Sequence, residues 1–131
     1  MVTRQYLIDT GIILDYLSGR LPEAGMNFLD SVVDAIPNIS AISKIELLSL
    51  QIPDQYRELV KELVQDSIVI ELSDNIVKNS ILINQTHAIE LNHSIIAATA
   101  VTYNYTLISN ITKPYAKIRG LSVVNPWEIF N

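Results

Sequence analysis

Short apolar runs alternate along this chain with longer segments in which apolar residues recur at helical spacing. Short runs rich in Ile, Leu and Val are typical of buried strands, whereas apolar residues at i, i+3, i+4 and i+7 are typical of helices that bury one face. Their alternation predicts βαβ units around a parallel sheet. The predicted strands are 6–9, 37–40, 68–71, 106–109 and 121–124.

Helical periodicity between these strands predicts helices over 11–17, 22–35, 53–66, 74–86 and 92–103. Pro22 suits a first helical turn, and Ser73 or Asp74 suits a helix cap. The last helix is rich in alanine, so we expect it to pack closely against the sheet. The helix 53–66 is expected to bury a stripe that consists of Tyr56, Leu59, Val60 and Leu63.

Length and composition indicate one α/β domain over residues 1–131. A chain of 131 residues is 49% hydrophobic and 18% charged, with a mean hydropathy of +0.27. This apolar balance is typical of a sheet that is covered on both faces. The chain is long enough to bury about 70% of the surface that its unfolded form exposes.

Several classes of protein are excluded or disfavoured by composition. The chain has no cysteine, which excludes disulfides, thiolate metal sites and a cysteine nucleophile. No apolar stretch reaches the roughly 20 residues of a membrane span, and the N-terminus lacks the layout of a signal peptide. We therefore expect a cytoplasmic protein without a membrane partner. A net charge of −5 and a pI of about 4.8 argue against broad electrostatic binding of nucleic acid.

Two acids follow predicted strands directly. Asp9 closes the first strand, and Glu46 comes soon after the second. Ligands of open α/β sheets bind at the carboxyl ends of the strands, so both acids are expected at a site. Each has an alternative role, because Asp9 also suits a helix cap and Glu46 fits a capping box that begins at Ser43. Ser40 offers a competing cap for that helix.

Five segments of the sequence carry a resemblance to a known family: 7–17, 39–50, 91–100, 105–109 and 120–128. In these segments, which span nearly the whole chain, the protein resembles PIN domains, and in particular the VapC-type ribonuclease toxins. The resemblance implies a three-layer α/β/α fold with a doubly wound, mainly parallel sheet of about five strands. It also implies cleavage of RNA by a water that Mg²⁺ or Mn²⁺ activates, an antitoxin protein as partner, and a homodimer.

The resemblance assigns roles to individual residues. Asp9 and Glu46 match the first two family acids, which are catalytic and bind metal, while Thr10 and Ser109 match supporting hydroxyl positions. His93 stands where the third acid belongs, and Pro114 stands where the fourth belongs.

The loss of two acids changes the expected chemistry. Mg²⁺ commonly uses one or two carboxylates and keeps several waters, so the two remaining acids suffice for one ion. The imidazole of His93 is expected to act as a third ligand or as an acid–base group. As a ligand it favours Mn²⁺, iron or zinc over Mg²⁺. His93 equally suits a capping or partly buried hydrogen-bonding role, with Glu90 as a substitute acid.

Other charged and aromatic residues have weaker assignments. Lys44 and Lys113 are expected to bind substrate phosphates, together with Lys117 and Arg119, although ordinary solubilising charge is the alternative. Asp15 lies about 1.7 helical turns beyond Asp9 and is expected to face away from the site. Trp127 is expected to pack the end of the chain rather than to stack on a base.

Two functions remain open from the sequence. The first is a metal-dependent endoribonuclease of a toxin–antitoxin system. The alternative is a catalytically impaired PIN-like domain that binds a protein or RNA.

Overall fold

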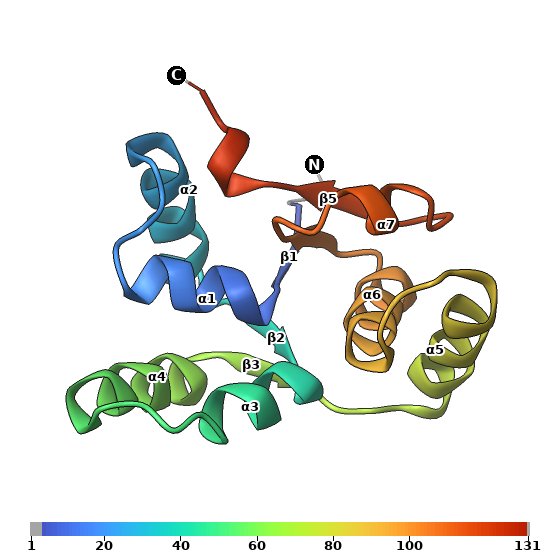
Figure 1. Cartoon of the computed structure of the whole chain (residues 1–131), viewed down its shortest axis with the longest axis horizontal. Helices are drawn as coiled ribbons and strands as arrows, with labels where there is room; N and C mark the ends of the chain where they lie inside the picture. The colour runs from blue at the N-terminus through green and yellow to red at the C-terminus, as the bar shows by residue number, and fades with distance from the viewer. Residues whose placement is uncertain (1–3, 131) are drawn as a thin grey trace.

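Five parallel strands form a single sheet in the computed structural model, which describes residues 4–130 (Figure 1). The strand order is β3-β2-β1-β4-β5. Each strand lies within its predicted range, and the predicted doubly wound α/β fold is confirmed. The strands are β1 (Tyr6–Ile8), β2 (Asn38–Ser40), β3 (Ile68–Ile70), β4 (Thr106–Ile108) and β5 (Ser122–Val124).

The first strand occupies the centre of the sheet. The chain builds outward from β1 to β2 and β3, and then returns to the other side of β1 to add β4 and β5. The direction of winding therefore reverses between β1 and β4. The carboxyl ends of the two strands at such a switch point are the region, called the crevice, where open α/β sheets bind their ligands.

The helices match the predicted ranges to within one residue where a range was predicted. They are α1 (Thr10–Leu17), α2 (Glu23–Asp34), α3 (Ala41–Leu48), α4 (Asp54–Asp66), α5 (Asp74–Thr86), α6 (Leu91–Tyr103), α7 (Lys113–Ala116) and the 3₁₀ turn η1 (Pro126–Glu128). No bounds were predicted for α3 and α7. Lys113 begins α7, where Pro114 fits the first turn.

Alternation along the strands separates two hydrophobic cores. Ile8, Ile39 and Ile108 face the core beneath α1 to α4, whereas Leu7 and Leu107 face the core beneath α5 and α6. Figure 1 shows these two groups of helices on opposite sides of the sheet. The alanines of α6 at positions 97, 98 and 100 are completely buried, as the small residues of this helix predicted.

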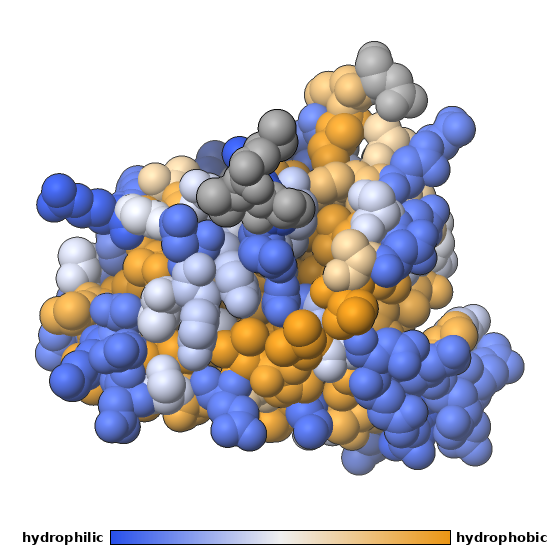
Figure 2. Space-filling view, turned by 180° about the vertical axis from the view of Figure 1, so that it is seen from behind, coloured by the Kyte–Doolittle hydropathy of each residue, from blue (hydrophilic) through white to orange (hydrophobic). Residues whose placement is uncertain are grey.

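The buried stripe predicted for α4 is only partly correct. Val60 and Leu63 are buried, but Tyr56 and Leu59 remain 47% and 43% exposed. The first turns of α4 extend past the core, so the continuing apolar face reaches the surface beside α1. On the opposite side of the molecule, hydrophobic residues also reach the surface between hydrophilic ones (Figure 2). Within residues 4–130, no helix is both long and apolar enough to cross a bilayer.

The 3₁₀ turn η1, near the end of the chain, contacts the first two helices. The Trp127 indole N–H donates to Asp15 Oδ2 over 3.0 Å, so Trp127 packs the chain end and Asp15 is engaged outside the predicted site. Gly25 of α2 lies against η1, and a Cβ at this position would collide with the carbonyl oxygen of Pro126. The close approach of α2 and η1 therefore depends on glycine at position 25.

Candidate functional site

Asp9 lies at the switch point between β1 and β4. Its backbone N–H donates to the carbonyl of Ile108 over 2.9 Å, which continues the pairing of the two strands. Its Oδ1 accepts from the backbone N–H of Thr10 at 2.8 Å, and its Oδ2 accepts from the hydroxyl of Ser109 at 2.7 Å. Asp9 thus caps α1 and also presents a carboxylate in the crevice, so its two predicted roles are compatible.

The buried carboxylate of Asp9 makes no ion pair within residues 4–130. The residue is 4% exposed, and burial raises the pKa of Asp9 despite the opposing hydrogen bond from Ser109. The charge of His93 and the N–H of Thr10 also lower this pKa, while the charge of Glu46 raises it. Within residues 4–130, ion pairs join Arg57 to Asp54 and Lys61 to Glu58, and none reaches the site. Buried charges are usually paired or bound to metal, so this carboxylate is a candidate ligand for a cation.

Glu46 reaches the same crevice from α3. The cap of α3 is Ser40, whose hydroxyl accepts from the Ser43 backbone N–H at 3.0 Å, so the capping box predicted to begin at Ser43 is wrong. The Glu46 carboxylate instead accepts from two side chains. Thr10 Oγ1 donates to Oε1 over 2.8 Å, and Asn92 Nδ2 donates to Oε2 over 2.9 Å. Helices α1, α3 and α6 therefore meet at this carboxylate.

A row of hydroxyls fixes the direction of the Thr10 bond. Thr10 Oγ1 lies 2.9 Å from Ser43 Oγ, which lies 3.3 Å from Ser40 Oγ. A hydroxyl carries a single hydrogen, and the ionised carboxylate of Glu46 can only accept. Thr10 must therefore donate to Glu46 and accept from Ser43, which in turn accepts from Ser40.

His93 lies in the first turn of α6, and its charge influences the carboxylate of Asp9. Its ring packs edge-to-face on Tyr115, with centroids 6.2 Å apart, and its backbone carbonyl lies 3.5 Å from the Tyr115 hydroxyl. Tyr115 is fully buried, and burial raises its pKa, so the phenol stays neutral. The N-cap of α6 is Glu90, which is exposed, so the predicted capping role of His93 is wrong. The ligand and acid–base roles of His93 stay predictions.

The predicted phosphate-binding lysines both lie on the surface. Lys44 is exposed on α3, two residues before Glu46, and residues at that spacing do not share a helix face. Lys113 is exposed at the start of α7, followed by Pro114. Their contact with substrate stays a prediction.

The residues of the crevice fit one hard divalent ion. Across residues 4–130, no group of three His, Cys, Asp or Glu side chains converges as a metal-binding set. Two carboxylates, with hydroxyl and amide oxygens nearby, nevertheless match the oxygen ligands that Mg²⁺ and Mn²⁺ prefer, with waters completing the shell. The same residues do not provide a site for a pair of metal ions.

Sequence reasoning missed several members of the site. Asn92 and Tyr115 contribute contacts although only their neighbours were singled out, and Ser43, considered only as a helix cap, contacts Thr10. The available signal for Asn92 was its place beside His93, in the first turn of a helix that faces the crevice.

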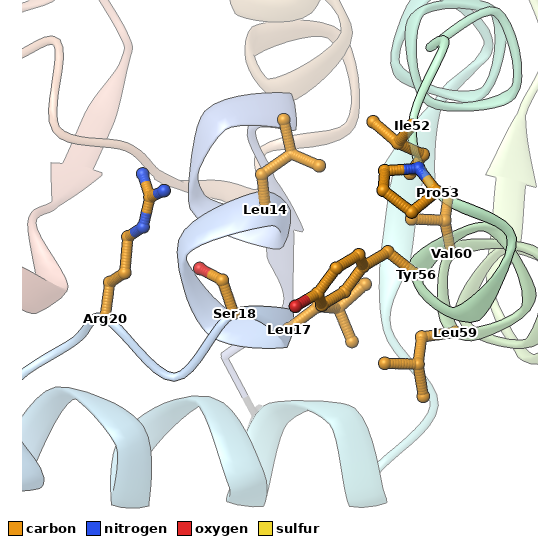
Figure 3. A pocket seen from close by; sticks show the side chains of 9 residues that line it. All are labelled: Leu14, Leu17, Ser18, Arg20, Ile52, Pro53, Tyr56, Leu59 and Val60. Carbon is orange, nitrogen blue, oxygen red and sulfur yellow. The ribbon is translucent and has the colours of Figure 1, made fainter.

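A separate apolar groove of about 570 Å³ lies between α1 and the first turns of α4 (Figure 3). In Figure 3 the ring of Tyr56 lies over Leu17, and Arg20 stands at the opposite rim. The groove is lined by Leu14, Leu17, Ser18, Arg20, Ile52, Pro53, Tyr56, Leu59 and Val60.

Comparison with known proteins finds clear likeness among solved structures. A chain of a toxin–antitoxin complex from Klebsiella pneumoniae is 27% identical, with a TM-score of 0.73 over 95% of this chain and 100% of that one. A chain of the DNA-bound VapBC2 structure from Rickettsia felis is 19% identical, with a TM-score of 0.74 over 92% and 97%. A chain of DNA-bound VapBC from Salmonella typhimurium is 14% identical, with a TM-score of 0.79 over 95% and 99%.

No model of a protein family matches the sequence, and no curated protein matches it significantly. The structural likenesses extend over nearly the whole chain and agree with the sheet order and the resemblance in sequence. The chain has the VapC-like PIN-domain fold.

Proposed function

We propose that this chain is a metal-dependent endoribonuclease of a toxin–antitoxin system, acting in the cytoplasm. The observation that carries the proposal is the acid pair Asp9 and Glu46, which meets at the switch point of the sheet without a basic partner among residues 4–130. The similarity to chains of toxin–antitoxin complexes supports the second half of the proposal.

The residues around the acids have distinct parts in this reaction. Asp9 and Glu46 hold a Mg²⁺ or Mn²⁺ ion, which when bound supplies an activated water and neutralises charge on the phosphodiester. Ser109 and Thr10 orient the two carboxylates through their hydroxyl groups. His93 is assigned the role of a general acid–base group, which accepts or returns a proton during cleavage.

Substrate contact is assigned to Lys44 of α3 and Lys113 of α7. Both side chains are exposed, so they are accessible to RNA phosphates. Contacts of this kind position a nucleic acid without reading its sequence.

The antitoxin is proposed to place an apolar segment in the groove between α1 and α4. Leu17, Tyr56 and Leu59 provide an apolar surface there, and Arg20 at the rim makes no ion pair within residues 4–130. A partner segment with an acidic residue next to its apolar ones complements this groove. Tyr56→Asp is expected to abolish co-purification with the antitoxin, while the same change at the exposed Gln65 leaves it intact.

A homodimer is proposed through the apolar surface around α5. Val77, Ile81 and Leu82 of α5 are 39%, 52% and 60% exposed, and Leu91 at the start of α6 is 62% exposed. Exposed apolar residues that gather in this way are typical of a protein interface. Ile81→Asp is expected to convert the dimer to a monomer in sedimentation analysis.

Cleavage of a mixed RNA pool in Mg²⁺ or Mn²⁺ tests the proposed activity. Asp9→Asn is expected to abolish cleavage, and Asp15→Asn is the matched control, because Asp15 is an acid of the same region that contacts Trp127 instead of the site. Activity of Asp9→Asn at the wild-type level would refute the proposal.

The alternative is a catalytically impaired PIN-like module that binds protein or RNA. Within residues 4–130, no third acidic or imidazole side chain converges with Asp9 and Glu46 to form a metal-binding group. This favours the non-catalytic function. It predicts neither cleavage nor Mn²⁺ binding by the folded, antitoxin-free protein.

A further inference from the structure

Two neutral donors from different helices fix the carboxylate of Glu46. Thr10 at the start of α1 donates to Oε1, and Asn92 in the first turn of α6 donates to Oε2 over 2.9 Å. A glutamate side chain has several rotatable bonds, so it occupies many positions unless its end is held. The two bonds together select one position for this carboxylate, inside the crevice.

Two adjacent residues in the first turn of α6 have different surroundings. Asn92 contacts Glu46, whereas the adjacent His93 packs on Tyr115 and lies near Asp9. Consecutive helical residues point about 100° apart, because the helix has 3.6 residues per turn. Asn92 is therefore the residue of this turn that directly contacts one of the two acids.

We propose that Asn92 is a positioning residue of the metal site and orients Glu46 for ion binding. This inference rests on the proposed function. An amide suits the task because it donates hydrogen bonds without carrying charge. A lysine or arginine at the same place would hold Glu46 equally well but would neutralise the charge that attracts the ion.

The test is the Mn²⁺ affinity of the full chain, measured by calorimetry or by the electron paramagnetic resonance signal of free Mn²⁺. Asn92→Ala is expected to weaken binding by about 10-fold or more, which is the usual effect of losing a residue that orients a metal ligand. The matched control is Asn79→Ala, because Asn79 also extends a side-chain bond to α6, to Thr102 Oγ1 over 2.8 Å. This control is expected to bind Mn²⁺ like the wild type.

A double-mutant cycle separates positioning from a general effect on folding. If Asn92 acts through Glu46, Asn92→Ala causes no further loss of affinity in a Glu46→Ala background. Thermal unfolding in chelator establishes that each variant is folded before its affinity is compared.

The outcomes distinguish this inference from the proposed function. Wild-type affinity in Asn92→Ala, or an equal loss in Asn79→Ala, overturns the role of Asn92 and leaves the metal site intact. A wild-type protein that binds no Mn²⁺ overturns both.

Discussion

The substitution Asp9→Asn exposes the conflict between stability and function at this site. The buried carboxylate has a raised pKa, so the folded protein holds a proton at position 9 more tightly than the unfolded chain does. Stability therefore falls as pH rises from the ordinary aspartate value of 3.8 through the higher value of the folded state. At neutral pH the charged group opposes folding, and a neutral asparagine of the same shape removes that cost. Asp9→Asn is expected to raise the melting temperature in chelator.

A bound ion reverses this order. A ligand that binds only the folded state at 100 times its dissociation constant adds about 2.7 kcal/mol of stability. For a domain of this size, 1 kcal/mol corresponds to roughly 4 °C in melting temperature. Saturating Mn²⁺ should therefore raise the melting temperature of the wild type by about 10 °C, and it should leave Asp9→Asn nearly unchanged because the variant has lost a ligand.

Differential scanning calorimetry in chelator and in MnCl₂ measures both effects. Asp15→Asn serves as the control, because it changes an acid that the structure places outside the site. The reasoning is refuted if Asp9→Asn melts below the wild type in chelator and if Mn²⁺ stabilises the two proteins equally.

Three further results are expected. Gly25→Ala should lower the free energy of unfolding by about 1–3 kcal/mol, because the added Cβ meets the Pro126 carbonyl. A denaturant titration that shows no loss of stability would contradict this close packing. A Cβ added at Gly11 would meet no atom within 4 Å, so Gly11→Ala should instead raise stability by up to about 1 kcal/mol in the same titration. Ser109→Ala removes a hydrogen bond that lowers the pKa of Asp9, so Mn²⁺ binding, followed calorimetrically across pH, should begin at a higher pH than in the wild type. An unchanged pH profile would show that this bond does not control the carboxylate.

The strands and the position of Asp9 could be predicted from sequence because both depend on local pattern. Strands buried on both faces read as short apolar runs, and the acid that ends such a run lies at the edge of the sheet. The registers of β1, β2 and β4 then bring Asp9 and Ser109 together.

The contacts of Glu46 could not be predicted in the same way. Thr10 and Asn92 are 36 and 46 residues away in sequence, and they meet Glu46 only because α1, α3 and α6 all begin at the carboxyl edge of the sheet. The exposure of Tyr56 similarly depends on how far α4 extends past the sheet, and helical periodicity does not predict this distance. In both cases the local sequence pattern predicted which side of a helix the residue lies on. What that side contacts depends on the tertiary arrangement of the elements.

Whether a divalent ion binds between Asp9 and Glu46 is the central question, and anomalous diffraction from crystals soaked in MnCl₂ answers it most directly. We predict an anomalous peak within bonding distance of both carboxylates. The soak uses a Mn²⁺ concentration at which no other site of the protein is occupied. A well-ordered crevice without such a peak would contradict the account.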